Sequence, residues 1–204
     1  MGFLQGPLTA RCYRVEADPP EGFRAVFPEA LNAHAFHEPM SKAWREEVVG
    51  WVVTQNLLDT HFERVETWLF NQYAFFSLRV DKKALPAKYL KALLDKRIEA
   101  WCQETQAKAC PRDVRADLKD ALEIELLAKT LPRVQVTECV WNLAERTVWF
   151  HSTSEKANER FRRIFHQTFG LVLLPDNPLE WVDETQAEAL AGGGAPDLAV
   201  EVLP

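Results

Sequence analysis

Alternating hydrophobic and polar positions predict two β-hairpins in the middle of the chain. Between residues 61 and 80, two alternating segments meet at Asn71 and Gln72, a pair typical of a tight turn. A second pair of segments rich in β-forming residues lies on either side of residues 142–145. In the first hairpin, the alternation places three apolar residues on one face: Phe76, Leu78 and Val80.

Helical spacing predicts two consecutive helices between these hairpins. The first begins at Pro86, a residue favoured in a first helical turn, and runs to about Lys108. Its apolar residues recur every three to four positions and form one stripe: Leu90, Leu94, Ile98 and Trp101. Pro111 breaks the pattern and Asp113 is a candidate cap for the next helix. We expect Leu94, Ile98 and Trp101 to share a core with the hairpin face.

The flanking segments complete a pattern of strands and helices. Strands are expected at 8–17, 46–53 and 171–175, with a short helix near 23–36 that Pro28 interrupts. A further helix runs from the candidate caps at Ser152 to Ser154 as far as Gly170. This order predicts an α+β fold, an antiparallel sheet with hairpins and with helices packed to one side.

The composition predicts one folded region followed by a tail. Residues 1–175 form the expected α+β region, with a helical and hairpin tip at about 82–142. Residues 176–204 are acidic and glycine-rich, and we expect them to be flexible. No apolar run approaches the ~18 residues of a membrane span, and the N-terminus lacks the pattern of a signal peptide. The expected location is therefore the cytoplasm.

The charge is distributed unevenly along the chain. The net charge is −6, which is unfavourable for a protein that binds a polyanion. Residues 81–163 nevertheless hold 17 basic and 13 acidic residues, net +4, whereas the flanks hold 7 basic and 17 acidic, net −10. This asymmetry permits one cationic surface on an acidic body.

Motifs of catalysis and cofactor binding are missing from the sequence. There is no glycine-rich phosphate loop, no nucleophile elbow and no cluster with metal-ligand spacing, and the pair His34 and His37 has no second cluster beside it. We therefore expect no enzymatic activity, no cofactor and no metal. Glu123, Glu125 and Glu138 leave a small nuclease as a remote alternative.

Basic residues gather around the second predicted helix. Lys108, Arg112 and Arg115 span the break before it, and Lys129 and Arg133 lie at its end. Such residues favour contact with phosphates, although a run of mixed charges is more often a solvated surface. A further set lies on one face of the last helix beside two glutamates, and we interpret it as structural: Lys156, Arg160 and Arg163.

Short motifs in a fixed order resemble the RdgC family of bacterial DNA-binding proteins. The resemblance covers roughly residues 8–181 and rests on these segments: Tyr13-Arg14, Gly50-Trp51-Val52, Asp81 to Pro86, Gln106-Ala107-Lys108, Leu118-Lys119-Asp120, Leu131-Pro132-Arg133 and Trp141. It implies a shortened, non-catalytic protein of DNA recombination or replication, associated with the nucleoid. It also implies a two-fold homodimer, which in the family closes into a ring with a basic inner surface.

The resemblance also assigns candidate DNA contacts. Two family positions are occupied by Lys108 and Arg133, and a basic stretch is kept in part as Arg112 and Arg115. With Lys129, these residues form the expected DNA-binding set. Where the family has an aromatic fingertip residue, this chain has the segment 134–136, Val-Gln-Val. This departure and the acidic flanks favour the alternative, an interaction or scaffold module that has lost DNA binding.

Overall fold

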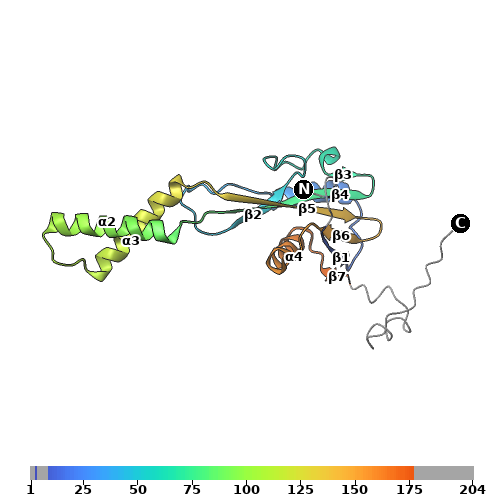
Figure 1. The fold of residues 1–204 in the computed structure, drawn as a ribbon. Coiled ribbons are helices and arrows are strands. Elements are labelled where there is room, and N and C mark those ends of the chain that lie inside the picture. The colour runs from blue at the N-terminus through green and yellow to red at the C-terminus, as the bar shows by residue number, and fades with distance from the viewer. Residues whose placement is uncertain (1–2, 4–8, 177–204) are drawn as a thin grey trace, which may run out of the picture.

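A seven-stranded sheet and four helices make up the described part of the chain, residue 3 and residues 9–176 of a computed structural model (Figure 1). The strands are β1 (Arg11–Val15), β2 (Val48–Val52), β3 (Leu69–Phe70), β4 (Tyr73–Lys82), β5 (Arg133–Asn142), β6 (Thr147–Phe150) and β7 (Leu173–Pro175). The helices are α1 (Phe23–Ala33), α2 (Ala87–Thr105), α3 (Arg112–Lys129), α4 (Glu155–Phe169) and the short 3-10 helix η1 (Val65–Thr67).

The sheet is antiparallel throughout, which confirms the predicted α+β class. Its strand order is β2-β4-β5-β6-β1-β7, and β3 pairs with β4 beside β2. The second predicted hairpin is β5 and β6, and Arg146 takes the positive φ of 57° in its turn. The expected tail, 176–204, lies almost wholly outside the described residues.

Helices α1 and α4 contact each other and bury their apolar residues in one core with the sheet. Trp141 of β5 lies at the centre of this core, with its ring centroid 5.1 Å from that of Phe27 and 5.2 Å from that of Phe165. Trp51 of β2 is also fully buried, and its Nε1 donates a hydrogen bond of 2.7 Å to Oγ1 of Thr168. Aromatic packing therefore fixes α4 on the sheet.

Local sequence signals explain most element boundaries, with two exceptions. Asn71 has the positive φ of 55° expected of a turn, and Gly170 ends α4 in the left-handed region with a φ of 68°. The prediction that Pro28 interrupts its helix is wrong, because α1 continues through it and buries Phe27 on the same turn. Asp113 lies inside the first turn of α3 and makes no capping hydrogen bond.

Helices α2 and α3 are inserted between β4 and β5 and extend beyond the end of the sheet as an arm, on the left of Figure 1. The predicted shared core is therefore wrong. Phe76 and its neighbours on β4 belong to the sheet core, whereas Leu94 is buried within the arm, where α2 packs against α3 and its buried Leu122. An apolar helical stripe needs a partner, and here the next helix provides it.

Candidate nucleic-acid interface

The arm separates the five predicted DNA contacts into two groups. Lys108, Arg112 and Arg115 lie at the far end of the arm, where α2 turns into α3. Lys129 ends α3 and Arg133 begins β5, so both lie where the arm joins the sheet (Figure 1). The 18 residues of α3 separate the two groups by about 27 Å at 1.5 Å per residue.

The far group consists of exposed cations. Within the described part of the chain, no hydrogen bond or ion pair engages the side chains of Lys108, Arg112 or Arg115. Arg112 and Arg115 are one helical turn apart in the first turns of α3, so their charges lie on neighbouring parts of its surface. These cations are free to meet an external anion, and we call them the tip cations.

Near the sheet, Lys129 is partly neutralised. Its Nζ lies 2.7 Å from Oε1 of Glu125, and the guanidinium of Arg97 pairs with the other carboxylate oxygen. Hydrogen bonds lower the pKa of Glu125, and the one from Lys129 contributes more than the one from Arg97. Glu125 therefore lies between two cations on the surface of the arm, and Lys129 is a weaker candidate for phosphate contact than the tip cations.

Arg133 stands opposite Lys82 in the register of β4 and β5. Both residues are exposed, and alternation places them on the sheet face that carries α4. The side chain of Lys82 reaches the carboxylate of Glu47, with Nζ 3.2 Å from Oε1. Arg133 thus belongs to a wider group of charges at the end of the sheet.

Glu47 is the centre of that group. Its carboxylate pairs with Lys82, with Lys156 at 3.7 Å and with Arg160. Desolvation opposes ionisation, but the hydrogen bonds from Lys82 and Arg160 outweigh it and hold the pKa of Glu47 below its usual value. A single carboxylate therefore faces three cations from two elements.

The last helix thus adds cations that the sequence did not assign to the site. Arg160 is largely buried and paired with Glu47, which agrees with a structural role. Lys156 keeps 72% of its side chain exposed, and Arg163 is also exposed. We call the exposed residues of this region the base cations: Lys82, Arg133, Lys156 and Arg163. The helical spacing of 156, 160 and 163 was the available signal, but the shared contact of Lys82, Lys156 and Arg160 with Glu47 required the fold.

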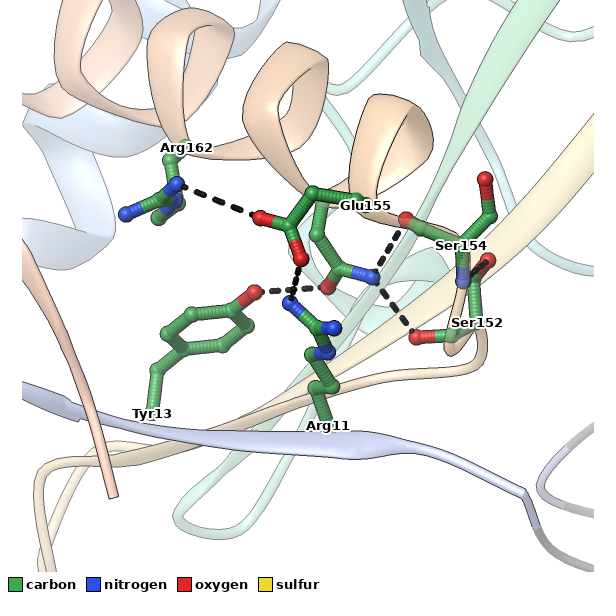
Figure 2. Close-up of polar contacts among 7 residues, drawn as sticks. Arg11, Tyr13, Ser152, Ser154, Glu155 and Arg162 are labelled. Atoms are coloured by element: carbon green, nitrogen blue, oxygen red, sulfur yellow. Dashed lines mark hydrogen bonds and ion pairs between the residues drawn. The ribbon is translucent and has the colours of Figure 1, made fainter. Parts of the chain in front are cut away.

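A polar cluster fixes the start of α4 against β1 (Figure 2). The hydroxyl of Tyr13 donates a hydrogen bond of 2.6 Å to Oδ1 of the buried Asn158. Nδ2 of Asn158 in turn donates to the backbone carbonyls of Ser152 and Ser154. Glu155 pairs with Arg11 on β1 at 2.7 Å. These partners all lie within the chain, so we assign the cluster to positioning α4 and its basic face.

Two cations fix the base of the arm to the segment before β2. Nζ of Lys83 lies 2.7 Å from the carbonyl oxygen of Lys42 and 2.8 Å from that of Leu127, and it lies over the ring of Trp44 at 5.1 Å. Arg45 pairs with Glu123 of α3 at 3.1 Å. The direction in which the arm leaves the sheet is thus held by specific contacts.

The glutamates considered for a nuclease site do not converge. Glu123 pairs with Arg45 and Lys119, and Glu125 is held by its own two cations. Oε2 of Glu138 accepts a hydrogen bond of 2.6 Å from the backbone of Phe3. Within residue 3 and residues 9–176, no group of three or more acidic, histidine or cysteine side chains has an arrangement that could hold a metal ion.

Comparison with known proteins gives one family. The family model described as "Putative exonuclease, RdgC" matches residues 9–191, which is most of the chain. A comparison with curated proteins gives no match. In the described ranges, none of the helices combines the length and the apolar character needed to cross a membrane.

Proposed function

Because the chain belongs to the RdgC family, we propose that it binds the phosphate backbone of DNA without sequence preference, in recombination or replication at the nucleoid. The observation that carries this proposal is the set of tip cations, Lys108, Arg112 and Arg115, which have no anionic partner among the described residues. Lysine and arginine that neutralise phosphates release counterions, and this contribution does not depend on base sequence.

The base cations support the same proposal. They add Lys82, Arg133, Lys156 and Arg163 from three elements, and the carboxylate of Glu47 pairs with two of them, Lys82 and Lys156. DNA that contacts both groups would follow the length of α3, about 27 Å. The phosphates of one DNA strand follow one another every 3.4 Å along the helix axis, so this length corresponds to about eight phosphates. The net charge of −6 repels DNA, but at short range the local positive potential of these cations outweighs this repulsion.

The direct experiment reverses one charge in each group. We expect the double variant Lys108→Glu, Arg133→Glu to bind two unrelated duplexes at least about tenfold more weakly, by similar factors for both. The matched control is Arg24→Glu, Arg64→Glu. It changes the net charge equally, at two exposed arginines. Arg24 of α1 lies beside the turns at 71–72 and 143–144, and Arg64 precedes η1 and β3, so both are at the end of the sheet opposite the arm. Fluorescence anisotropy at low and moderate salt measures both variants.

A folded double variant that binds as tightly as the parent would contradict the proposal. The scaffold alternative would then be the better account, since it requires no phosphate contacts. The ion pairs of Lys129 and Arg97 with Glu125 favour this alternative locally, because they are satisfied without DNA.

The absence of catalysis is also part of the proposal, although the family description names an exonuclease. We expect the chain to leave linear and supercoiled DNA intact in the presence of Mg²⁺ or Mn²⁺. Release of nucleotides that scales with protein concentration and stops on chelation would overturn this part, whereas the DNA-binding part would stand.

A further inference from the structure

A hollow of about 350 Å³ lies beside β3, at the end of the sheet away from the arm (Figure 1). Three parts of the chain line it: the loop after β2, the short helix η1 and the hairpin of β3 and β4. Its volume is in the range of sites that hold small molecules in proteins, which is about 300 to 1,000 Å³. None of the functions considered so far uses this hollow.

Three aromatic side chains form the apolar part of the hollow. Phe70 lies opposite Tyr73 in the register of β3 and β4, and alternation places both on the same sheet face as Phe75. The ring centroid of Phe75 is 5.7 Å from that of Phe70 and 6.5 Å from that of Tyr73. This face is opposite to α1 and α4, because the neighbours Ala74 and Phe76 belong to the core. Phe70 is 43% exposed, so its ring is accessible to a ligand.

Polar but uncharged side chains complete the lining. Thr54 and Thr67 contribute hydroxyl groups, and Gln55 and Asn71 contribute amides. Among the described residues, neither amide side chain has a hydrogen-bond partner, and no charged residue lines the hollow. Each amide presents donors and an acceptor. The hollow therefore offers hydrogen bonds in both directions without attracting an ion.

The two hydroxyl groups are held in place by the chain and keep capacity for a ligand. Oγ of the buried Ser77 donates a hydrogen bond of 3.1 Å to Oγ1 of Thr54, which leaves the proton of Thr54 available. Oγ1 of Thr67 donates a hydrogen bond of 2.7 Å to the carbonyl of Arg64, which leaves its oxygen as an acceptor. Since these groups are already ordered, a ligand loses less free energy in fixing them.

We propose that this hollow binds an uncharged, planar nitrogen heterocycle of the kind found in nucleobases. Aromatic side chains stack on such rings whatever their sequence context. The amides and hydroxyls match the donors and acceptors on the edge of the ring, whereas an aliphatic or phenyl group would leave them without partners. The lining gives a phosphate group no cation to pair with. The site is remote from the tip and base cations, so it can fail or succeed independently of the proposed phosphate contacts.

Threonine methyl groups report directly on the hollow. Thr54 and Thr67 line it, whereas Thr105 and Thr130 belong to the arm. In NMR spectra of the full chain labelled at threonine methyls, we expect adenosine, cytidine or thymidine at millimolar concentration to shift the first pair and not the second. Ribose, which lacks the heterocycle, should shift neither pair. The proposal is overturned if none of the three nucleosides shifts Thr54 or Thr67.

Phe70→Ala tests the stacking surface. We expect the nucleoside that binds best to bind this variant at least about fivefold more weakly. The matched control is Leu58→Ala, which truncates another exposed apolar side chain in the loop between β2 and η1 and should bind like the parent. A folded Phe70→Ala with parental affinity would contradict the proposal. If this variant does not fold, Gln55→Leu decides, since loss of the exposed amide should also weaken binding about fivefold.

Two further ligands identify the source of the ring. A short single-stranded oligonucleotide that shifts Thr54 and Thr67 would assign the site to a base within a strand. Shifts with nucleosides alone would assign it to a free ligand, and either result supports recognition of the heterocycle. N-acetylphenylalaninamide serves as the competitor, because it carries an aromatic ring without polar edge groups. Shifts as large as those of the best nucleoside would assign the hollow to a side chain of a protein partner and overturn the proposal.

Discussion

Nζ of Lys83 donates a hydrogen bond of 2.8 Å to the backbone carbonyl of Leu127, and this contact joins the end of β4 to the last turn of α3. A cation at the C-terminus of a helix interacts favourably with carbonyls that have no helical partner. The contact closes the arm at its base, although the two residues are 44 positions apart. The placement of the tip cations relative to the sheet depends on it.

Removing this cation should loosen the end of α3. We expect Lys83→Met to increase amide exchange about fivefold at Thr130, whose N–H donates to the same carbonyl of Leu127, because about 1 kcal/mol of local stability is lost. Hydrogen exchange followed by mass spectrometry measures this. The control is Lys88→Met, at an exposed lysine of α2. Equal exchange in the two variants would show that Lys83 does not close the arm.

Glu47 should make the stability of the folded chain depend on pH. Its pKa is lowered in the folded protein, so its ionised form stabilises the fold above the unfolded pKa, and this stabilisation is lost as pH falls through the folded pKa. We expect Glu47→Gln to lower the free energy of unfolding by about 1 kcal/mol at neutral pH and by much less near pH 3. Urea titrations at the two pH values give the difference.

Glu159→Gln serves as the matched control for this measurement, because it removes an exposed carboxylate from α4, the helix that supplies Lys156 and Arg160 to Glu47. Its effect should be small at both pH values. A difference for Glu47→Gln that stays constant from neutral to acid pH would mean that its ion pairs contribute nothing to stability.

The buried indoles should respond differently to replacement by phenylalanine. Trp51 and Trp141 are both fully buried, but Nε1 of Trp51 donates to Thr168, whereas Nε1 of Trp141 has no hydrogen-bond partner within the described residues. Both variants leave a cavity, and only Trp51→Phe also breaks a buried hydrogen bond. We expect Trp51→Phe to be less stable than Trp141→Phe by about 1 kcal/mol in denaturant unfolding. The opposite order would contradict this account.

The sequence predicted local features well because their causes are local. Asn71 and Gly170 favour positive φ, and the alternation from Phe76 to Val80 gives the buried face of β4 correctly. The apolar stripe of α2 was recognised, but its partner was not. A stripe that includes Leu94 packs equally well on a sheet or on a neighbouring helix, and only the fold decides between them.

The candidate site was predictable only in part for the same reason. The cations around Lys108 stand out because they are close together in sequence and accompany the family motifs. Glu47 joins the charges at the base of the arm, and it is 35 residues from Lys82 and 113 from Arg160. Contacts over such separations leave no local pattern, so Lys156 and Arg163 looked like ordinary helix charges.

The salt dependence of DNA binding by the tip cations tests the central claim most directly. Each phosphate neutralised in duplex DNA contributes about 0.9 to the slope of log affinity against log salt. If all three tip cations contact phosphates, the triple variant Lys108→Ala, Arg112→Ala, Arg115→Ala should bind with a slope flatter than the parent by about 2.7. The control Arg24→Ala, Arg64→Ala should keep the parental slope. An unchanged slope in a folded triple variant would contradict the assignment of the tip of the arm as a DNA-binding surface.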